Sequence, residues 1–176
     1  MEDIMDLKSK IRVIEGFPKE GISFKDITTL LKDKDAFKET VDMLCDKVKD
    51  LEFDYIAGIE ARGFIFAVPM AYKLNKGFIP VRKPGKLPGK VITKEYDLEY
   101  GKNQIEIDAD VLKSGDRVLL IDDLLATGGT AKAALEIIEE TGAKVVCAGF
   151  LIELEDLKGI ELFGDYNTFT LIKYEH

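Results

Sequence analysis

The sequence predicts an α/β protein in which helices flank a central, mostly parallel β-sheet. Apolar runs rich in β-branched residues alternate along the chain with segments whose apolar residues recur every three or four positions. Repeated strand, helix and strand favour parallel pairing, because a parallel pair needs a long crossover connection. The runs at 118–121 and 145–152 are apolar without alternation, as expected of strands buried on both faces.

The first half of the chain supplies a helix and then a strand. Residues 35–51 carry apolar side chains at intervals of four and three, which is one face of a helix, and Asp33 or Asp35 is its expected cap. These apolar side chains are Phe37, Val41, Leu44, Val48 and Leu51. A short apolar run at 55–59 then predicts the first strand of the sheet.

A second helix and strand follow. We expect a helix over 63–74, with Pro69 either kinking it or marking a late start, and a strand over 78–81. Residues 82–101 lack helical periodicity and contain two Pro-Gly-type turns, so they predict a long exposed loop of the kind that forms lids and binding loops. Residues 104–107 alternate as an edge strand does.

Composition narrows the classes of function. With 176 residues, 46% hydrophobic and 33% charged, the chain is sized for one folded domain over 1–176. Its formal net charge of −8 argues against non-specific nucleic-acid binding, so an anionic ligand must be attracted by a local basic segment. The single histidine, His176, stands last, which argues against histidine-based catalysis and a zinc site.

The compartment expected from the sequence is the cytoplasm. Cys45 and Cys147 form no CxxC pair and lie among apolar neighbours, as buried reduced thiols do. The amino terminus is acidic, and no apolar run approaches the length of a membrane span. We therefore expect neither a membrane nor a nucleic acid as partner.

The run VLLIDDLLATGGTA, residues 118–131, carries most of the chemical information. A buried strand ends in Asp122 and Asp123, and a Thr-Gly-Gly-Thr loop then opens a helix, with Thr130 as its expected cap and Gly142 as its stop. Ligands of parallel sheets bind beyond the carboxyl ends of strands, which is where this run is predicted to lie.

The loop suits a phosphate monoester. Gly128 and Gly129 allow backbone N–H groups to approach an anion, the helix dipole favours negative charge, and Thr127 and Thr130 add hydroxyl donors. The adjacent carboxylates suit sugar hydroxyls or the waters of a magnesium ion. The structural alternative is an acidic turn followed by a solvated helix cap. No GxxxxGK[ST] or GxGxxG motif occurs, which excludes the P-loop and dinucleotide-binding classes.

This run resembles the phosphoribosyl-pyrophosphate signature of type I phosphoribosyltransferases, and other blocks extend the resemblance over nearly the whole chain. They are GFPKEGISFKDITTLL, YIAGIEARGFIFA, VRKPGKLPG and YDLEYG, in the family's order and spacing. The resemblance implies the family's fold, with residues 1–33 forming a small hood and 82–101 a flexible lid loop. It also implies transfer of a phosphoribosyl group to a purine, and the hood and LEYG blocks point to adenine.

The resemblance also implies roles for residues at the phosphate-bearing end. The loop Ala126, Thr127, Gly128, Gly129 and Thr130 holds the 5′-phosphate, and Asp122 and Asp123 address the ribose hydroxyls. Arg62, Arg82, Lys83 and Lys86 match the pyrophosphate positions, where an arginine presents a bidentate fork. A cis peptide bond is expected between residues 60 and 61 or between 61 and 62. Without the resemblance, an ion pair at the protein surface is an equally good interpretation of Arg62.

The segment 82–94 also stands out by charge. It holds five basic residues and no acidic one, in a protein of net charge −8, which favours a pyrophosphate-receiving segment over a merely solvated loop. The basic residues are Arg82, Lys83, Lys86, Lys90 and Lys94.

At the base end, Glu99 matches the family's acid/base residue, because adenine must lose a proton as it attacks the sugar. Phe24 is the expected stacking platform, with core packing as the alternative, and backbone groups of 22–25 are expected to read the amine of the base. Ser23 and Lys25 stand where the family often has valine and arginine, and Lys25 lacks the planar fork of arginine.

The implied cofactor is Mg²⁺ chelated by the phosphoribosyl pyrophosphate, with no direct protein cage. The implied assembly is a homodimer. Two rival functions stay open: phosphoribosyl transfer to another purine, and a purine-responsive regulator that uses this fold and binds DNA. The regulator is opposed by the acidic amino-terminal segment, since such proteins carry an added basic domain.

Overall fold

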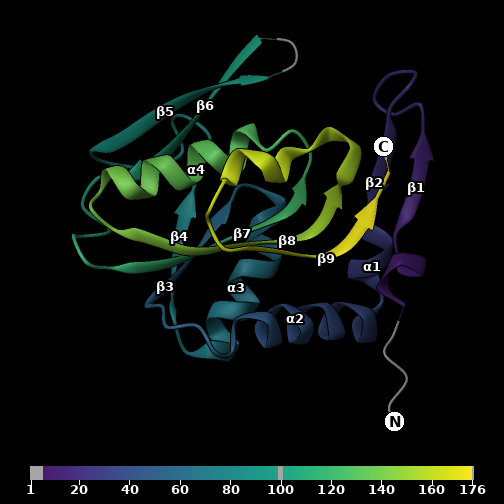
Figure 1. Ribbon diagram of the computed structural model, residues 1–176, viewed down its shortest axis with the longest axis horizontal. Helices are drawn as coiled ribbons and strands as arrows, with labels where there is room; N and C mark the ends of the chain where they lie inside the picture. Colours follow the sequence, from purple (N-terminus) through teal and green to yellow (C-terminus); the bar gives the residue numbers. More distant parts are fainter. Residues whose placement is uncertain (1–5, 99–100, 176) are drawn as a thin grey trace.

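A five-stranded parallel sheet forms the centre of the molecule (Figure 1). The computed structural model describes residues 6–98 and 101–175. The strand order is β4-β3-β7-β8-β9, and every neighbouring pair is parallel. The mostly parallel sheet predicted from the sequence is thus confirmed. The strands are β3 (Tyr55–Ile59), β4 (Gly77–Val81), β7 (Arg117–Leu125), β8 (Lys144–Leu154) and β9 (Thr168–Tyr174).

Helices cover both faces of this sheet. In Figure 1, α2 (Lys34–Val48) and α3 (Arg62–Leu74) lie on one face and α4 (Gly129–Glu140) lies on the other. The side chains of β7 alternate between the two resulting cores: Leu119 and Ile121 pack with α2 and α3, whereas Val118 and Leu120 pack with α4. Both faces of β7 are buried, which explains its unbroken apolar run.

The helix boundaries correct two details of the sequence reading. Asp33 caps α2 as expected, accepting from the N–H groups of Asp35 and Ala36. The expected cap of α4 at Thr130 is wrong: Gly128 is the N-cap, with a φ of +85° that glycine adopts readily, so Thr130 lies in the first turn. Pro69 lies inside α3 and does not mark its start.

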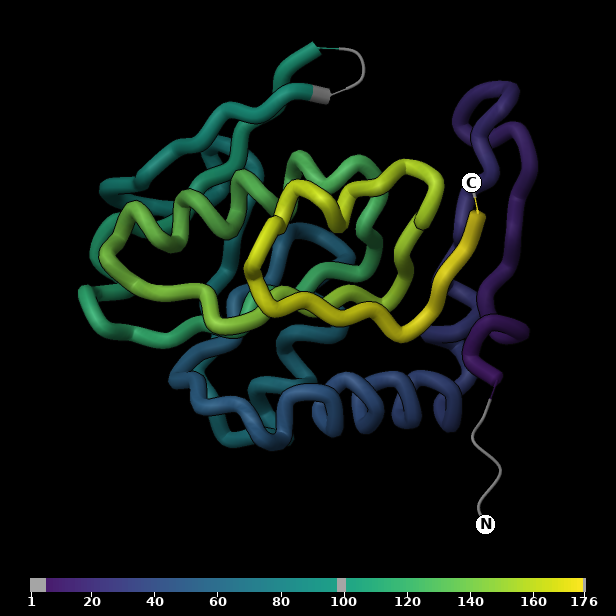
Figure 2. Tube along the Cα trace, viewed as in Figure 1, coloured from purple at the N-terminus to yellow at the C-terminus, as the bar shows by residue number. Residues whose placement is uncertain are grey.

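The predicted lid loop 82–101 is wrong for residues 91–98, which form a strand. β5 (Val91–Leu98) pairs antiparallel with β6 (Gly101–Asp108), and this hairpin extends beyond α4 in Figures 1 and 2. Lys94 forms ion pairs with Glu136 and Glu140 of α4 at 3.3 and 3.0 Å. The edge strand predicted over 104–107 lies within β6 and is confirmed, whereas its partner β5 was missed, because the charged residues of β5 leave little apolar alternation.

The hood segment holds secondary structure that the sequence reading did not predict. It comprises η1 (Leu7–Lys10), β1 (Arg12–Glu15), β2 (Ser23–Asp26) and α1 (Thr28–Lys32). β1 and β2 form an antiparallel hairpin, which lies beside the carboxyl end of β9 in Figure 1.

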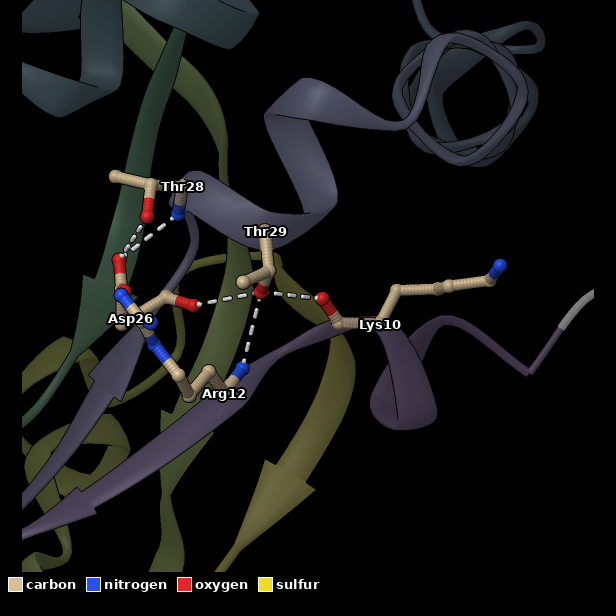
Figure 3. A network of polar contacts seen from close by, with 5 residues as sticks. All are labelled: Lys10, Arg12, Asp26, Thr28 and Thr29. Atoms are coloured by element: carbon tan, nitrogen blue, oxygen red, sulfur yellow. Dashed lines mark hydrogen bonds and ion pairs between the residues drawn. The ribbon is translucent and has the colours of Figure 1, made fainter.

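Hydrogen bonds to Asp26 connect this hairpin to α1 (Figure 3). Its Oδ2 accepts from Arg12 Nε and Nη2 at 3.0 and 2.5 Å, and its Oδ1 accepts from the N–H and hydroxyl of Thr28 at 2.9 and 2.7 Å. The hydroxyl of Thr29 donates to Lys10 O at 2.7 Å and accepts from Arg12 N–H at 3.2 Å. One carboxylate therefore ties together both hood strands and the start of α1.

Two further observations concern the cysteines and the helices. Cys45 and Cys147 are free and buried, as expected from their neighbours. Burial raises the pKa of the Cys147 thiol to about 11, so this thiol stays protonated at neutral pH. Within residues 6–98 and 101–175, no helix has both the length and the apolar character needed to cross a bilayer.

The Asp26 network predicts a pH dependence of stability. Hydrogen bonds from Thr28 and Arg12 lower the pKa of Asp26 from 3.8 to about 2. A depressed folded-state pKa gives stability that is present above the unfolded value and is lost as the pH falls through the folded value. The difference in melting temperature between the wild type and Asp26→Asn should therefore be largest above about pH 4 and shrink toward about pH 2. Calorimetry across this range measures it, and a constant difference would contradict it.

Candidate active site

A cavity of about 270 Å³ opens where the carboxyl ends of β3 and β7 meet the start of α4. The sequence placed the acidic pair and the Thr-Gly-Gly-Thr loop at this edge of the sheet, and the structure brings both to one cavity. Ile59, Glu60, Ala61 and Arg62 form one wall, and the residues from Asp122 to Ala131 form the other.

The loop before α4 is shaped to receive an anion. Thr127, Gly128, Gly129 and Thr130 all line the cavity, and Gly128 as N-cap has no side chain with which to occupy the first N–H groups of the helix. These N–H groups can donate hydrogen bonds to a phosphate. The positive end of the helix dipole adds about 0.3–1 kcal/mol of stabilisation, as is typical of exposed helix ends.

Gly159 supports this loop from behind and was missed by the sequence analysis. It opens η3 (Gly159–Phe163), and a Cβ at its position would lie 2.2 Å from Ala126 O and 2.8 Å from Gly128 N. A Cβ on Gly128 would in turn lie 2.6 Å from Gly159 O. The two backbone segments are in contact at Gly128 and Gly159. These glycines are far apart in the sequence, so no local motif predicts the contact.

The acidic pair is largely shielded from water, since Asp123 is buried and Asp122 is half-buried. Asp123 is 5% exposed, and its Oδ2 forms an ion pair with Arg62 Nε at 2.8 Å but accepts no hydrogen bond from the described residues. Asp122 Oδ1 accepts from the N–H of Asp123 at 2.8 Å. A buried oxygen without a hydrogen bond is costly, so a ligand hydroxyl or a metal-bound water would find an acceptor here.

Burial and mutual repulsion shift the titration of this pair. Burial and then the charge of Asp123 raise the pKa of Asp122 well above its ordinary value. Burial also raises the pKa of Asp123, while the guanidinium of Arg62 opposes that rise. Each of the two adjacent carboxyls therefore binds a proton more readily than an isolated one, and a cation or a hydrogen-bond donor in the cavity would oppose that rise in pKa.

Gly63 allows α3 to approach the pair closely. A Cβ at this position would lie 2.9 Å from Asp122 Oδ1 and 3.0 Å from Ile121 O. The glycine that follows Arg62 in the sequence therefore lets the first turn of α3 rest on the end of β7, and this contact sets where Arg62 stands.

Arg62 links the acidic pair to the hood. Its guanidinium lies 5.6 Å from the centre of the Phe24 ring while its Nε contacts Asp123. Phe24 is half-buried and packs edge-to-face with Phe17 at 5.1 Å, so it lies beside Arg62 and outside the two buried cores. The bond between Glu60 and Ala61, in the same wall, is cis, as the resemblance implied.

Lys25 points the other way. On β2 its side chain alternates with that of Phe24, and its Nζ donates to Ser23 Oγ at 2.6 Å and lies 5.1 Å from the Tyr174 ring centre. Ser23 Oγ donates in turn to Glu15 Oε1 at 3.0 Å. The two positions that depart from the family pattern are therefore bonded to one another. The structure does not bring the Lys25 side chain to Arg62.

Of the five basic side chains in segment 82–94, two form ion pairs and three are exposed. Arg82 forms a bidentate pair with Glu60, a residue the sequence analysis did not single out, and Lys94 pairs with α4. Lys83, Lys86 and Lys90 are exposed. The predicted acid/base residue, Glu99, lies outside the described residues.

These features define a class. The model of the phosphoribosyl transferase domain family matches residues 26–176, and the chain belongs to this family.

The relatives narrow the comparison to one kind of enzyme. A protein from Clostridium botulinum (strain Alaska E43 / Type E3), named adenine phosphoribosyltransferase, is 57% identical over 171 residues, which cover 97% of this chain and 99% of the relative. The crystal structure of adenine phosphoribosyltransferase from Thermoanaerobacter pseudethanolicus is 47% identical with a TM-score of 0.94 and covers 97% and 99% of the two chains. The enzyme from Giardia lamblia, complexed with 9-deazaadenine, is 38% identical with a TM-score of 0.92 and full coverage of both chains.

The Gly159 contact predicts a specific sensitivity. Gly159→Ala should displace the phosphate loop, because the added Cβ overlaps Ala126 O and Gly128 N. We expect a loss of about 1–3 kcal/mol in unfolding free energy from the overpacking and a larger proportional loss of phosphate-ester affinity. Denaturant unfolding and calorimetric titration measure the two. Gly164→Ala is the control for a loss of stability alone, because a Cβ there meets no atom within 4 Å while the φ of +53° strains the backbone. Normal ligand affinity in Gly159→Ala would contradict the proposed support.

Proposed function

We infer that this chain transfers the 5-phosphoribosyl group from 5-phosphoribosyl-1-pyrophosphate to adenine, giving AMP and pyrophosphate, as in purine salvage. The observation that carries this conclusion is the joint presence, in one cavity, of a helix N-terminal phosphate loop and a desolvated acidic pair. The identity of 53–58% to adenine phosphoribosyltransferases supports adenine as the acceptor. The chain is therefore an enzyme of the pentosyltransferase class.

The phosphate loop and the acidic pair divide the donor between them. The 5′-phosphate is proposed to rest on the N–H groups and hydroxyls of the loop from Ala126 to Thr130. Asp122 and Asp123 accept from the ribose hydroxyls, and their negative charge stabilises the cationic character that C1′ gains as the bond to pyrophosphate breaks. The unsatisfied oxygen of Asp123 supports this assignment.

Pyrophosphate and magnesium are proposed to lie at the opposite wall. Arg62, Lys83 and Lys86 are the basic residues proposed to contact this end of the donor, and Arg82 belongs to the same group of basic residues through its pair with Glu60. Magnesium, when bound, neutralises charge on the leaving pyrophosphate, and carboxylates that bind through water suit a cation with octahedral preference. Among the described residues, the carboxylates that line the cavity are those of Glu60, Asp122 and Asp123.

The base is proposed to stack on Phe24, with the backbone of residues 22–25 reading its amine. The half-buried ring beside Arg62 supports this placement. Glu99 is proposed to accept the proton that adenine loses, on the resemblance of the LEYG block. Lys25 contributes to this site through its backbone and through its bond to Ser23, since its ammonium lies on the other face of β2.

The activity predicts a base preference and a metal requirement. With the donor and magnesium present, adenine should be converted to AMP with a higher kcat/KM than hypoxanthine or guanine are converted to their nucleotides. Removing magnesium with a chelator should abolish turnover, and adding it back should restore it. Separate incubations followed by nucleotide chromatography measure both. Equal or better use of hypoxanthine would replace adenine by another purine, and DNA retention without turnover would favour the regulator.

The base platform predicts a selective loss of affinity. Phe24→Ala should weaken adenine binding by roughly 1–3 kcal/mol, since the aromatic stacking surface is removed, while donor binding stays nearly unchanged. Phe24→Tyr keeps the ring and is the matched control. Titration of adenine and of the donor separates the two effects, and an unchanged adenine dissociation constant would remove Phe24 from the site.

We also propose a homodimer, supported by the outer face of α3. Val68 and Tyr72 stand one turn apart on this helix and are 46% and 91% exposed, which is unusual for large apolar side chains that stay in water. Light scattering should give twice the mass of the 19.7 kDa chain, and Tyr72→Glu should shift the protein toward monomer. A wild type that stays monomeric at micromolar concentration would refute the dimer.

A cytoplasmic location is proposed as well. It is supported by two unpaired, buried cysteines, which match a reducing compartment. Cell fractionation tests it, and recovery of the protein outside the cytoplasmic fraction would exclude it.

A further inference from the structure

A carboxylate lines the wall of the cavity where an anion is expected. Glu60 directly follows β3, and its side chain is 14% exposed. Hydrogen bonding from Arg82 lowers its pKa against the effect of burial, so it is anionic at neutral pH. A fixed negative charge near pyrophosphate opposes binding unless it serves another purpose.

The contacts of Glu60 show that purpose. Its Oε2 accepts from Arg82 Nε at 3.2 Å and from the N–H of Lys83 at 2.9 Å, and its Oε1 accepts from Arg82 Nη2 at 3.1 Å. The N–H of Glu60 donates to Val81 O at 2.9 Å. Backbone and side chain together thus join the turn after β3 to the segment after β4.

Arg82 is fixed from its other side too. Its N–H and carbonyl pair with Glu106 of β6 at 2.9 and 2.7 Å, and the buried carboxylate of Glu106 accepts from the N–H of Gly85 at 3.1 Å. The guanidinium of Arg82 is therefore held by Glu60, and its Nη1 also donates to Lys86 O at 3.4 Å. Of the described residues, those that line the cavity include Glu60 and Arg62 but not Arg82.

We propose that Glu60 is a positioning residue for the pyrophosphate end of the site, and that Arg82 acts as its partner and not as a direct ligand of the anion. The bidentate pair fixes the turn Glu60–Ala61–Arg62 against β4, and this turn carries Arg62 to its place beside Asp123. The inference rests on the proposed function, because it assigns the leaving group to this wall.

The geometry makes Arg62 sensitive to this pair. Arg62 begins α3 immediately after the turn, and its Nε stands 2.8 Å from Asp123 while its guanidinium stands 5.6 Å from the Phe24 ring. A shift of the turn moves this side chain relative to both neighbours. A displacement near 1 Å of a group that binds a reactant reduces catalysis by up to about 100-fold.

The test compares Glu60→Gln, Arg82→Lys and the double variant in the full-length enzyme. Each single variant breaks the bidentate pair, so each should raise the donor KM and the pyrophosphate dissociation constant by about 10- to 100-fold. The adenine KM should change less than about 3-fold. The double variant should be no worse than the poorer single variant, because both remove the same interaction. Kinetics and calorimetric titration of magnesium pyrophosphate give these values.

The control is a similar pair at the other end of the same strand. Asp54 precedes β3 and binds Arg117 through Nε at 3.1 Å and Nη2 at 2.9 Å, far along the strand from the cavity. Asp54→Asn should lower the melting temperature without changing the donor KM. If Asp54→Asn changes the donor KM as much as Glu60→Gln does, the effect is one of general stability and the proposal fails.

The remaining outcomes also decide the matter. Tighter pyrophosphate binding in Glu60→Gln would show that Glu60 competes with the anion for Arg82, which contradicts positioning. An Arg82→Lys loss that greatly exceeds the Glu60→Gln loss, with additive effects in the double variant, would make Arg82 a direct ligand. Unchanged constants in Glu60→Gln would also overturn the proposal. If the wild type forms no AMP, the proposed function fails first, and it does so independently of this result.

Discussion

The rest of this structure depends on two adjacent carboxyl groups at the end of a buried strand, of which Asp123 is buried and Asp122 is half-buried. Asp122 and Asp123 repel one another, and burial penalises the charge of each. Such a pair persists only with compensation, and the molecule provides it through Arg62 at 2.8 Å. The close approach of α3, the glycine that permits it and the pairing that fixes the preceding turn all determine where that guanidinium stands.

The same arginine connects two parts of the protein that are distant in sequence. The hood contacts Arg62 through Phe24 of β2, and the position of β2 depends on Asp26 at its end. Charge at the sheet and an aromatic ring at the hood therefore meet at one side chain. An enzyme that joins an anionic sugar donor to a flat base needs this meeting of unlike surfaces.

Much of this was predictable because it is local in sequence. The apolar runs predicted the parallel sheet, and the carboxyl end of the strand at 118–121 predicted where Asp122, Asp123 and the phosphate loop lie. Of the hairpin, the strand over 104–107 was predicted, but β5 was not, since its charged side chains hide its alternation. The pairing of Glu60 with Arg82 and the contact of Gly159 with the loop depend on residues far apart in the chain, and only the folded backbone brings them together.

Helix α4 has two separate roles, one at its first turn and one on its outer side. Its first turn forms the phosphate loop, and its outer side holds β5 through Lys94, Glu136 and Glu140. Asp97 O of the same hairpin lies 3.2 Å from where a Cβ on Gly129 would stand. For protein engineering, this means that the solvent-facing acids of α4 are poor sites for tags, labels or charge reversal, although their exposure invites such use. The surface of α2, which has no part in the cavity, is the better place to attach a probe.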